Sequence, residues 1–269
     1  MFPESKSKLK RTDNWDPHFY KHFEGYQTLL PYWASISDRF LNAWPTITDY
    51  NRLAEEAAFA FRFIEQDAHT PYESTIFHHQ RIPTRLHNWH DFFNNVSWLI
   101  FPSMKRALIE TAYQAADNKP KQRTSKQNVL AHFDECGMVI CSDERCYLDK
   151  IRQHEWSSLF LDRNLEIHCY PIITGHGILE KGLQPYIGMT AKAILMEVNS
   201  AFFKLDKIEK LRYVDERIAT EIVSPEFPNT PKALAPFPLL GWPKWHPDND
   251  KDSFFGNIHY FRPKPKIIG

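Results

Sequence analysis

The chain has 269 residues, a length that suits one large domain. Hydrophobic residues make up 42% and charged residues 25%, ordinary proportions for a protein with a packed core, so wholesale disorder is excluded. The 33 Lys and Arg residues balance the 33 Asp and Glu residues. This argues against general nucleic-acid binding, because such binding depends on a large excess of positive charge.

The predicted elements begin after a polar N-terminus. Residues 1–14 are polar and charged and predict a flexible segment. They lack the apolar run of a secretory signal, and no apolar stretch approaches the roughly 20 residues that cross a bilayer. We therefore expect a cytoplasmic protein without a membrane partner. For the remainder we expect one globular domain, 15–223, and a Pro- and aromatic-rich arm, 224–269, packed on that domain.

Helical patterns dominate the predicted domain. Helix formers, capping residues and apolar periodicity indicate six helices. They are Tyr50–Ile64, Arg85–Ala116 with a bend at Pro102, a short helix from Thr124 or Ser125 to Phe133, Cys146–Leu161, Gly175–Leu183 and Leu205–Ile222. Residues 67–84 read as a loop with one short strand, and Pro and Lys residues predict a break over 117–123.

Strand patterns are fewer and shorter. Gly137–Ser142 is an apolar, β-branched run that predicts a strand. Glu166–Thr174 predicts a second strand, which Pro171 makes an edge or bulged one. Residues 190–203 fit a helix or a strand equally well. The predicted fold class is α+β and predominantly α-helical: a helical body, a small two- to three-stranded sheet and a Pro/Trp-rich C-terminal arm.

One segment combines several metal-ligating side chains. At about 100° per residue, His87, His90, Asp91 and Asn94 share one face of a helix. Lys and Glu, the usual solvent-facing residues of helices, are absent from 86–104, which indicates that this face is covered. Imidazole and carboxylate groups on one helical turn can bind a divalent ion. We therefore predict His87, His90 and Asp91 as ligands of Zn, Mn or Fe.

Two alternatives stay open for this face. Covered polar groups need partners, and a metal-free catalytic or ligand-binding network would supply them as well as an ion would. Structural hydrogen bonding is the third interpretation. The spacing also differs from the H-E-x-x-H signature, whose histidines are four residues apart, so the pattern alone does not decide among the three.

Two further blocks carry residue types used in catalysis. Asp134 and Glu135 are adjacent carboxylates near the end of a predicted helix, suited to metal ligation or general-base chemistry. His176 stands between two glycines at a strand-to-helix turn, with Glu180 on the same helical face. We predict His176, Glu180 and Asp134 as catalytic residues. The glycine spacing matches neither a P-loop nor a dinucleotide fingerprint, so no nucleotide cofactor is expected.

These blocks also carry a family resemblance. They read Pro83-x3-His87-Asn88-Trp89-His90-Asp91-Phe92-x-Asn94, Phe101-Pro102-x2-Lys105-x-Ala107-Leu108, Phe133-Asp134-Glu135-x-Gly137, Gly175-His176-x3-Glu180-Lys181-x2-Gln184-Pro185-Tyr186 and Thr190-Ala191-Lys192. Together with Gly241–Asp250, they resemble a bacterial family catalogued only as a domain of unknown function. The resemblance implies a bacterial intracellular protein and indicates that the blocks belong together, but it implies no reaction.

Three functions fit these predictions. The first is a metal-dependent hydrolase of the phosphoesterase or nuclease type, acting on a small-molecule or phosphate-containing substrate; it requires the segment at His87 and the turn at His176 to converge. The second is a metal-free enzyme that binds a small ligand, with His176 or His90 as the general base. The third is a non-catalytic interaction protein, which predicts an exposed apolar patch around the arm. The first is preferred.

Overall fold

The computed structural model describes residues 14–67, 70–116 and 123–265. Most of the predicted flexible N-terminus and most of the predicted break over 117–123 lie outside these residues. The helices are α1 (Leu30–Ile36), α2 (Ile47–Glu56), α3 (Tyr72–His79), α4 (Trp89–Ile100), α5 (Pro102–Gln114), α6 (Ser125–Cys136), α7 (Arg145–Gln153), α8 (Trp156–Phe160), α9 (Leu165–His168), α10 (His176–Lys181), α11 (Ala201–Lys204), α12 (Lys207–Val223) and α13 (Asp252–Phe255).

The strands form two small sheets. They are β1 (Arg62–Glu65), β2 (Arg81–Thr84), β3 (Gly137–Ser142), β4 (Cys169–Ile173), β5 (Thr190–Glu197) and β6 (Ala235–Pro238). The parallel pair β1–β2 stands apart from a four-stranded sheet of order β4-β3-β5-β6. Helices predominate over strands, so the predicted helix-rich α+β class is confirmed.

The four-stranded sheet is larger than predicted. β3 runs antiparallel to β4 and parallel to β5, and β6 of the C-terminal arm pairs antiparallel with β5. The additional strands are β5, from the segment that fitted helix or strand equally, and β6. Both edge strands contain proline, Pro171 in β4 and Pro236 and Pro238 in β6. The edge position predicted from Pro171 is therefore confirmed.

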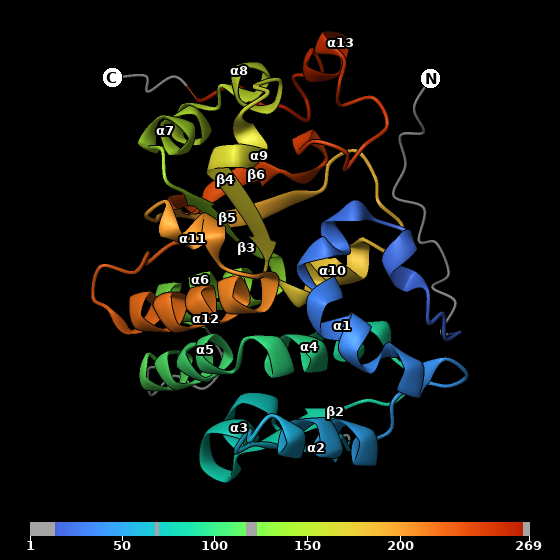
Figure 1. The fold of residues 1–269 in the computed structure, drawn as a ribbon. Coiled ribbons are helices and arrows are strands. Elements are labelled where there is room, and N and C mark those ends of the chain that lie inside the picture. The colour runs from blue at the N-terminus through green and yellow to red at the C-terminus, as the bar shows by residue number, and fades with distance from the viewer. Residues whose placement is uncertain (1–13, 68–69, 117–122, 266–269) are drawn as a thin grey trace.

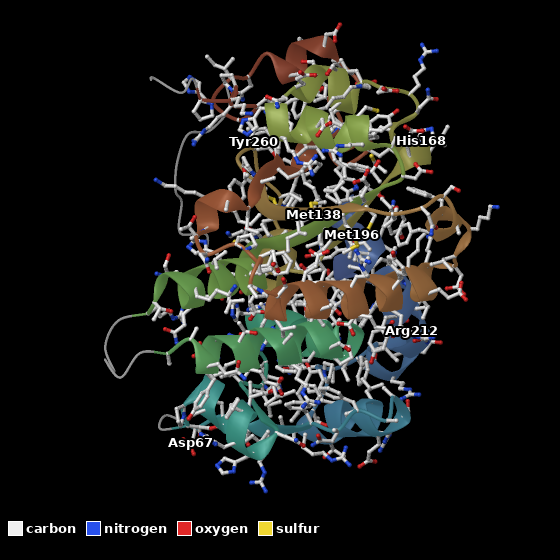
Figure 2. All side chains as sticks on the ribbon, turned by 90° about the vertical axis from the view of Figure 1, so that its left-hand side faces the viewer. Asp67, Met138, His168, Met196, Arg212 and Tyr260 are labelled. Atoms are coloured by element: carbon white, nitrogen blue, oxygen red, sulfur yellow. The ribbon has the colours of Figure 1, made fainter. Side chains whose placement is uncertain are left out.

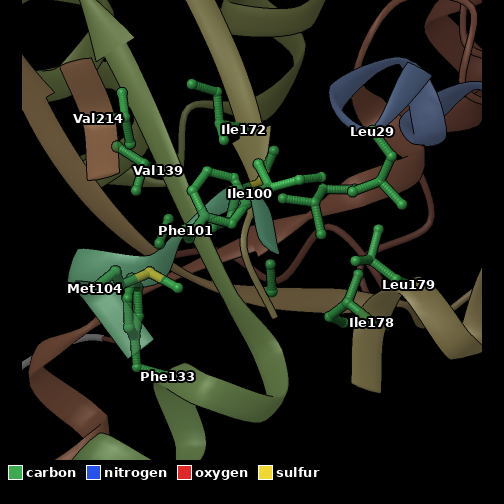
Figure 3. Packing of buried hydrophobic residues seen from close by; sticks show 14 of the residues in the cluster. Leu29, Ile100, Phe101, Met104, Phe133, Val139, Ile172, Ile178, Leu179 and Val214 are labelled. Atoms are coloured by element: carbon green, nitrogen blue, oxygen red, sulfur yellow. The ribbon is translucent and has the colours of Figure 1, made fainter. Parts of the chain in front are cut away.

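The elements are stacked in layers (Figure 1). α6 and α12 lie beside the four-stranded sheet, the row formed by α4 and α5 lies next to them, and α2, α3 and the β1–β2 pair lie beyond that row. The core continues through these layers. Figure 3 shows Val139 of β3 and Ile172 of β4 near Phe101, Met104 and other buried side chains of the helices. Met138 and Met196, labelled in Figure 2, are buried at the centre of the sheet.

The first region where the prediction is wrong is the segment after α2. This helix starts at Ile47 because Thr46 and Asp49 form a reciprocal capping box, and it ends at Glu56. The predicted helix continues to Ile64, but its last three residues belong to the strand β1, 62–65. Asn51 holds that strand, since its side chain donates to Phe63 O (2.9 Å) and accepts from Phe63 N (2.8 Å). The predicted loop 67–84 contains α3 as well as its expected strand, β2.

The predicted helix over 85–116 is divided into α4 and α5 at Phe101–Pro102, close to the expected bend. It also begins later than predicted. Asn88 is the N-cap of α4 and accepts a hydrogen bond from Asp91 N at 3.0 Å. His87 has φ 54°, in the left-handed region, so the helix cannot extend back through it. His87 therefore leaves the helical face on which the sequence placed it.

The C-terminal arm contributes buried aromatic side chains in addition to β6. Trp242, Trp245, Phe255 and Phe261 are buried. Tyr260, labelled in Figure 2, donates from its hydroxyl to Met189 O at 2.8 Å. The arm is thus tied to the sheet by main-chain and side-chain contacts. Among the described residues, no helix combines the length and the apolar character needed to cross a membrane.

Candidate metal centre

Three segments far apart in the sequence bring one polar cluster together. His90 is the second residue of α4, Glu135 lies at the end of α6, and His176 is the first residue of α10. α10 packs against both α4 and α6. Gly137 O accepts hydrogen bonds from the backbone N–H groups of residues 174 and 175, at 3.1 and 2.9 Å. These bonds fix the start of α10 beside the end of α6.

The two glycines that flank His176 allow this close approach. A Cβ atom on Gly175 would lie 2.4 Å from Gly137 N, and one on Gly177 would lie 2.4 Å from Glu135 Oε2. The first contact is with backbone, which cannot move aside. The Gly-His-Gly sequence is therefore explained by packing of α10 against the end of α6.

The donor atoms of the cluster have the spacing of metal ligands. His90 Nε2 lies 3.2 Å from His176 Nε2, and Glu135 Oε1 lies 3.5 Å from His176 Nε2 and 3.8 Å from His90 Nε2. A zinc ion with bonds of about 2.0–2.1 Å and tetrahedral angles separates its ligand atoms by about 3.3 Å. His90, Glu135 and His176 thus form a group that could hold a metal ion.

The second nitrogen of each histidine faces a carboxylate. His90 Nδ1 lies 3.1 Å from Glu180 Oε2, a hydrogen-bonding distance. His176 Nδ1 lies 3.8 Å from Asp134 Oδ2 and has no hydrogen-bond partner among the described residues. In both histidines Nε2 points into the cluster and Nδ1 points to its outer carboxylate. Metal-binding histidines typically show this arrangement.

The cluster is buried on one side and open on the other. The side chains of His176 and Glu180 are 4% and 6% exposed, whereas that of Glu135 is 48% exposed. The hydrogen bond with Glu180 raises the pKa of His90 above 6.5, against the opposing effect of burial. The contact with His176 lowers the pKa of Glu135 to about 2, assisted by the nearby His90 and Lys105. Glu135 is therefore an ionised carboxylate at neutral pH.

A buried lysine extends the cluster inward. The Lys105 side chain is 2% exposed, and its ammonium donates to Asp134 Oδ1 at 2.5 Å and to Asn94 Oδ1 at 2.8 Å. Asn94 Nδ2 and Trp98 Nε1 both donate to the hydroxyl oxygen of Tyr72, at 2.8 and 3.1 Å. These polar groups therefore satisfy one another and connect α3, α4, α5 and α6.

A family model described as "Protein of unknown function (DUF3025)" matches residues 61–265. The chain belongs to this family. The match contains every residue of the cluster and confirms the resemblance seen in the sequence blocks. No curated protein and no solved structure matches the chain.

In this DUF3025 member the structure brings together four of the six residues predicted for the site. They are His90, His176, Glu180 and Asp134. The required convergence of the two histidine segments is thus present. The other two lie outside the cluster: His87 is exposed in the turn before α4. The Asp91 carboxylate accepts three hydrogen bonds from Arg85, from its backbone N, Nε and Nη2.

Two residues of the site were not among those six. Glu135, which the sequence indicates together with Asp134 as a possible metal ligand or general base, supplies the third donor atom. Lys105 belongs to one of the family blocks, but the sequence assigned it no role in the site. A signal for it exists in the sequence, because it is the first Lys after a long stretch without Lys or Glu and follows Asn94 by eleven residues, close to three helical turns.

Proposed function

We propose that the protein is a metal-dependent hydrolase whose ion is bound by His90, His176 and Glu135. The observation that supports this most is the convergence of three donor atoms at metal-ligand spacing, with both Nδ1 atoms turned to carboxylates. Two imidazoles and one carboxylate suit Zn, Mn and Fe. The separations of 3.2 to 3.8 Å between the donor atoms would let one ion contact all three after small side-chain movements.

The charges around the cluster also favour a divalent cation. Three carboxylates, those of Asp134, Glu135 and Glu180, face the two histidines, and Lys105 is the cation paired with one of them. A partly buried group of carboxylates beside two imidazoles creates a negative potential that attracts cations.

The arrangement suits hydrolysis because three protein ligands leave a further position for water or substrate. Glu135 is half-exposed, so one side of the cluster is accessible from solvent. When bound, the ion would lower the pKa of a water molecule and polarise the bond to be cleaved. Glu180 orients His90, and Asp134 faces His176. A phosphate ester of a small molecule is the proposed substrate class, since the balanced net charge does not suit a long nucleic acid.

The raised pKa of His90 supports a second candidate, a metal-free site. In that case His90 carries a proton that it shares with Glu180 and exchanges with a substrate as general acid or base. The metal content of the protein separates the two candidates.

The first experiment measures bound metal in protein purified without a histidine tag, by plasma mass spectrometry. We expect near-stoichiometric Zn, Mn or Fe in the parent and its loss in the His90→Ala/His176→Ala double variant. The matched control is His87→Ala/His132→Ala, which removes two exposed histidines outside the cluster and retains the metal. Hydrolysis of p-nitrophenyl phosphate and bis-p-nitrophenyl phosphate is then compared among the three proteins.

Parent protein that stays metal-free after incubation with each ion would exclude the metal-dependent hydrolase. Metal-free protein whose activity still requires His90 would favour the acid–base site. Metal-loaded protein that cleaves neither ester would exclude the phosphate-ester assignment while leaving the metal site in place.

A further inference from the structure

The two histidines of the cluster are held unequally. His90 Nδ1 is hydrogen-bonded to Glu180, whereas His176 Nδ1 is buried, lacks a hydrogen-bond partner among the described residues and lies 3.8 Å from Asp134 Oδ2. Asp134 instead uses its other oxygen, Oδ1, to accept from Lys105. Lys105 thus holds the carboxylate that His176 Nδ1 faces.

Lys105 is poorly explained by stability alone. Burying an ammonium group is costly, and replacing a buried ion pair by apolar side chains of similar volume is often neutral or stabilising. Trp98 lies beside it, with the Lys105 Nζ atom 5.5 Å from the centre of the ring. An uncharged side chain of the same length would pack against that ring without losing hydration. The charge of Lys105 therefore calls for a role beyond packing.

Lys105 is itself fixed from several sides. Its ammonium donates to Asn94 and Asp134 and faces the ring of Trp98. Asn94 is in turn anchored on the Tyr72 hydroxyl, which also accepts from Trp98. A cation held this firmly gives the Asp134 carboxylate one position, with Oδ1 on the lysine and Oδ2 toward His176.

We propose that Lys105 is a positioning residue for His176 and acts through Asp134. By directing Asp134 Oδ2 at His176 Nδ1, it favours the imidazole tautomer with the proton on Nδ1 and leaves Nε2 free to bind a cation. This inference rests on the proposed metal site. It adds a series of contacts that supports the site, from Lys105 in α5 through Asp134 in α6 to His176 in α10. Outer groups of this kind typically change metal affinity by about 10–100-fold when they are removed.

The test compares the two buried lysines of the described chain. Lys210 is 8% exposed and donates to the backbone carbonyls of Phe203 and Leu205, with no part in the cluster. Zinc dissociation constants are measured by competition with a chelator for the wild type, Lys105→Met and Lys210→Met. We expect Lys105→Met to weaken zinc binding at least about 10-fold and Lys210→Met to leave it within twofold, although both substitutions alter stability.

Asp134→Asn is the second variant, and its partly exposed side chain makes it the safer substitution if Lys105→Met does not fold. Because the proposed effect passes through Asp134, the double variant Lys105→Met/Asp134→Asn should bind zinc no more weakly than the weaker single variant. Equal zinc affinity in Lys105→Met and the wild type, or fully additive losses in the double variant, would overturn the proposal.

A spectroscopic measurement on the metal-free protein separates this proposal from the metal site. Imidazole 15N chemical shifts of His176 should show the Nδ1-protonated tautomer in the wild type and in Lys210→Met, and a mixture of tautomers in Asp134→Asn. If the wild type binds no zinc, the proposed function fails, and the tautomer still decides whether Asp134 orients His176. An unchanged tautomer in Asp134→Asn would contradict the positioning role directly.

Discussion

Two buried carboxylates lie beside the starts of two consecutive helices, α4 and α5, and they bind different kinds of group. Glu180, from α10, meets the side chain of His90 at the start of α4. Asp215, from α12, meets the backbone instead, accepting from Ser103 N at 3.1 Å and Met104 N at 2.7 Å at the start of α5. Backbone donors are neutral and fixed, so Asp215 anchors a helix. An imidazole can exchange its proton or bind an ion, so Glu180 is suited to orient His90 in the proposed metal site.

The largest expected effect concerns the packing at the start of α10, the helix that carries Glu180. Gly175→Ala places a Cβ atom 2.4 Å from Gly137 N and 2.7 Å from Glu135 O, both backbone atoms. We expect the free energy of unfolding to fall by about 3 kcal/mol, measured by urea denaturation. Gly256→Ala is the control, because its nearest contact is 3.3 Å; it should change stability by less than about 1 kcal/mol. Equal effects of the two substitutions would remove the packing explanation of the Gly-His-Gly turn.

Zinc should stabilise the protein through the histidine cluster beside Glu180 and not through Asp215. At a free zinc concentration 100-fold above the dissociation constant, the free energy of unfolding should rise by about 2.7 kcal/mol. The gain should be present in the wild type and in Asp215→Asn, and absent from His90→Ala/His176→Ala. Chemical denaturation with and without zinc measures it. A gain that persists in the double histidine variant would place the ion elsewhere.

Exchanging each carboxylate for its amide tests the comparison most directly. Asp215→Asn loses one of two backbone hydrogen bonds, so stability should fall by about 1 kcal/mol while zinc affinity stays the same. Glu180→Gln keeps the shape of the side chain but weakens the orientation of His90, and it should reduce zinc affinity by about 10-fold or more. Calorimetric titration and denaturation are run on both variants. If Asp215→Asn changed the zinc affinity as much as Glu180→Gln does, Asp215 and Glu180 would not have separate roles.

The smallest effect is a pH dependence at Asp215. Burial raises the pKa of this carboxyl above 3.8, despite its hydrogen bonds to Met104 and Ser103. As the pH rises above 3.8, the unfolded chain releases this proton before the folded chain does. The free energy of unfolding of the wild type should therefore fall relative to Asp215→Asn until the pH exceeds the folded pKa, and then become constant. Urea titrations of both proteins between pH 3 and neutrality measure this difference; a constant difference would contradict the raised pKa.

Much of the fold could be predicted where local signals decide it. β3 has the predicted limits, 137–142, because an apolar β-branched run follows a glycine. α6 begins after Thr124, whose capping box with Gln127 is a local sequence feature. β1 could not be predicted, because its partner β2 follows only after α3. Its four residues are also too few to show the alternation of apolar and polar residues that marks a strand.

The site was partly predictable for the same reason. His90 and His176 are marked by local patterns, a helix without Lys or Glu and a glycine-flanked turn. Which other residues join them depends on backbone geometry at single positions. The left-handed conformation of His87 turns it away from the face of α4. Asp91 forms an ion pair with Arg85 instead of joining the cluster. Whether Asp134 or Glu135 supplies the third donor atom depends on how α6 is rotated against α10, which the sequence does not reveal.

The prolines of β6 have a consequence for how the protein behaves at high concentration. Main-chain N–H groups alternate sides along a strand, and Leu239 N, next after β6, donates inward to Met189 O at 3.0 Å. The positions of Pro236 and Pro238 are therefore those whose N–H groups would point away from the sheet. Proline has no N–H to offer there. An incoming strand from another molecule would find no donor at these two positions, so this edge of the sheet resists the edge-to-edge association through which β-proteins aggregate.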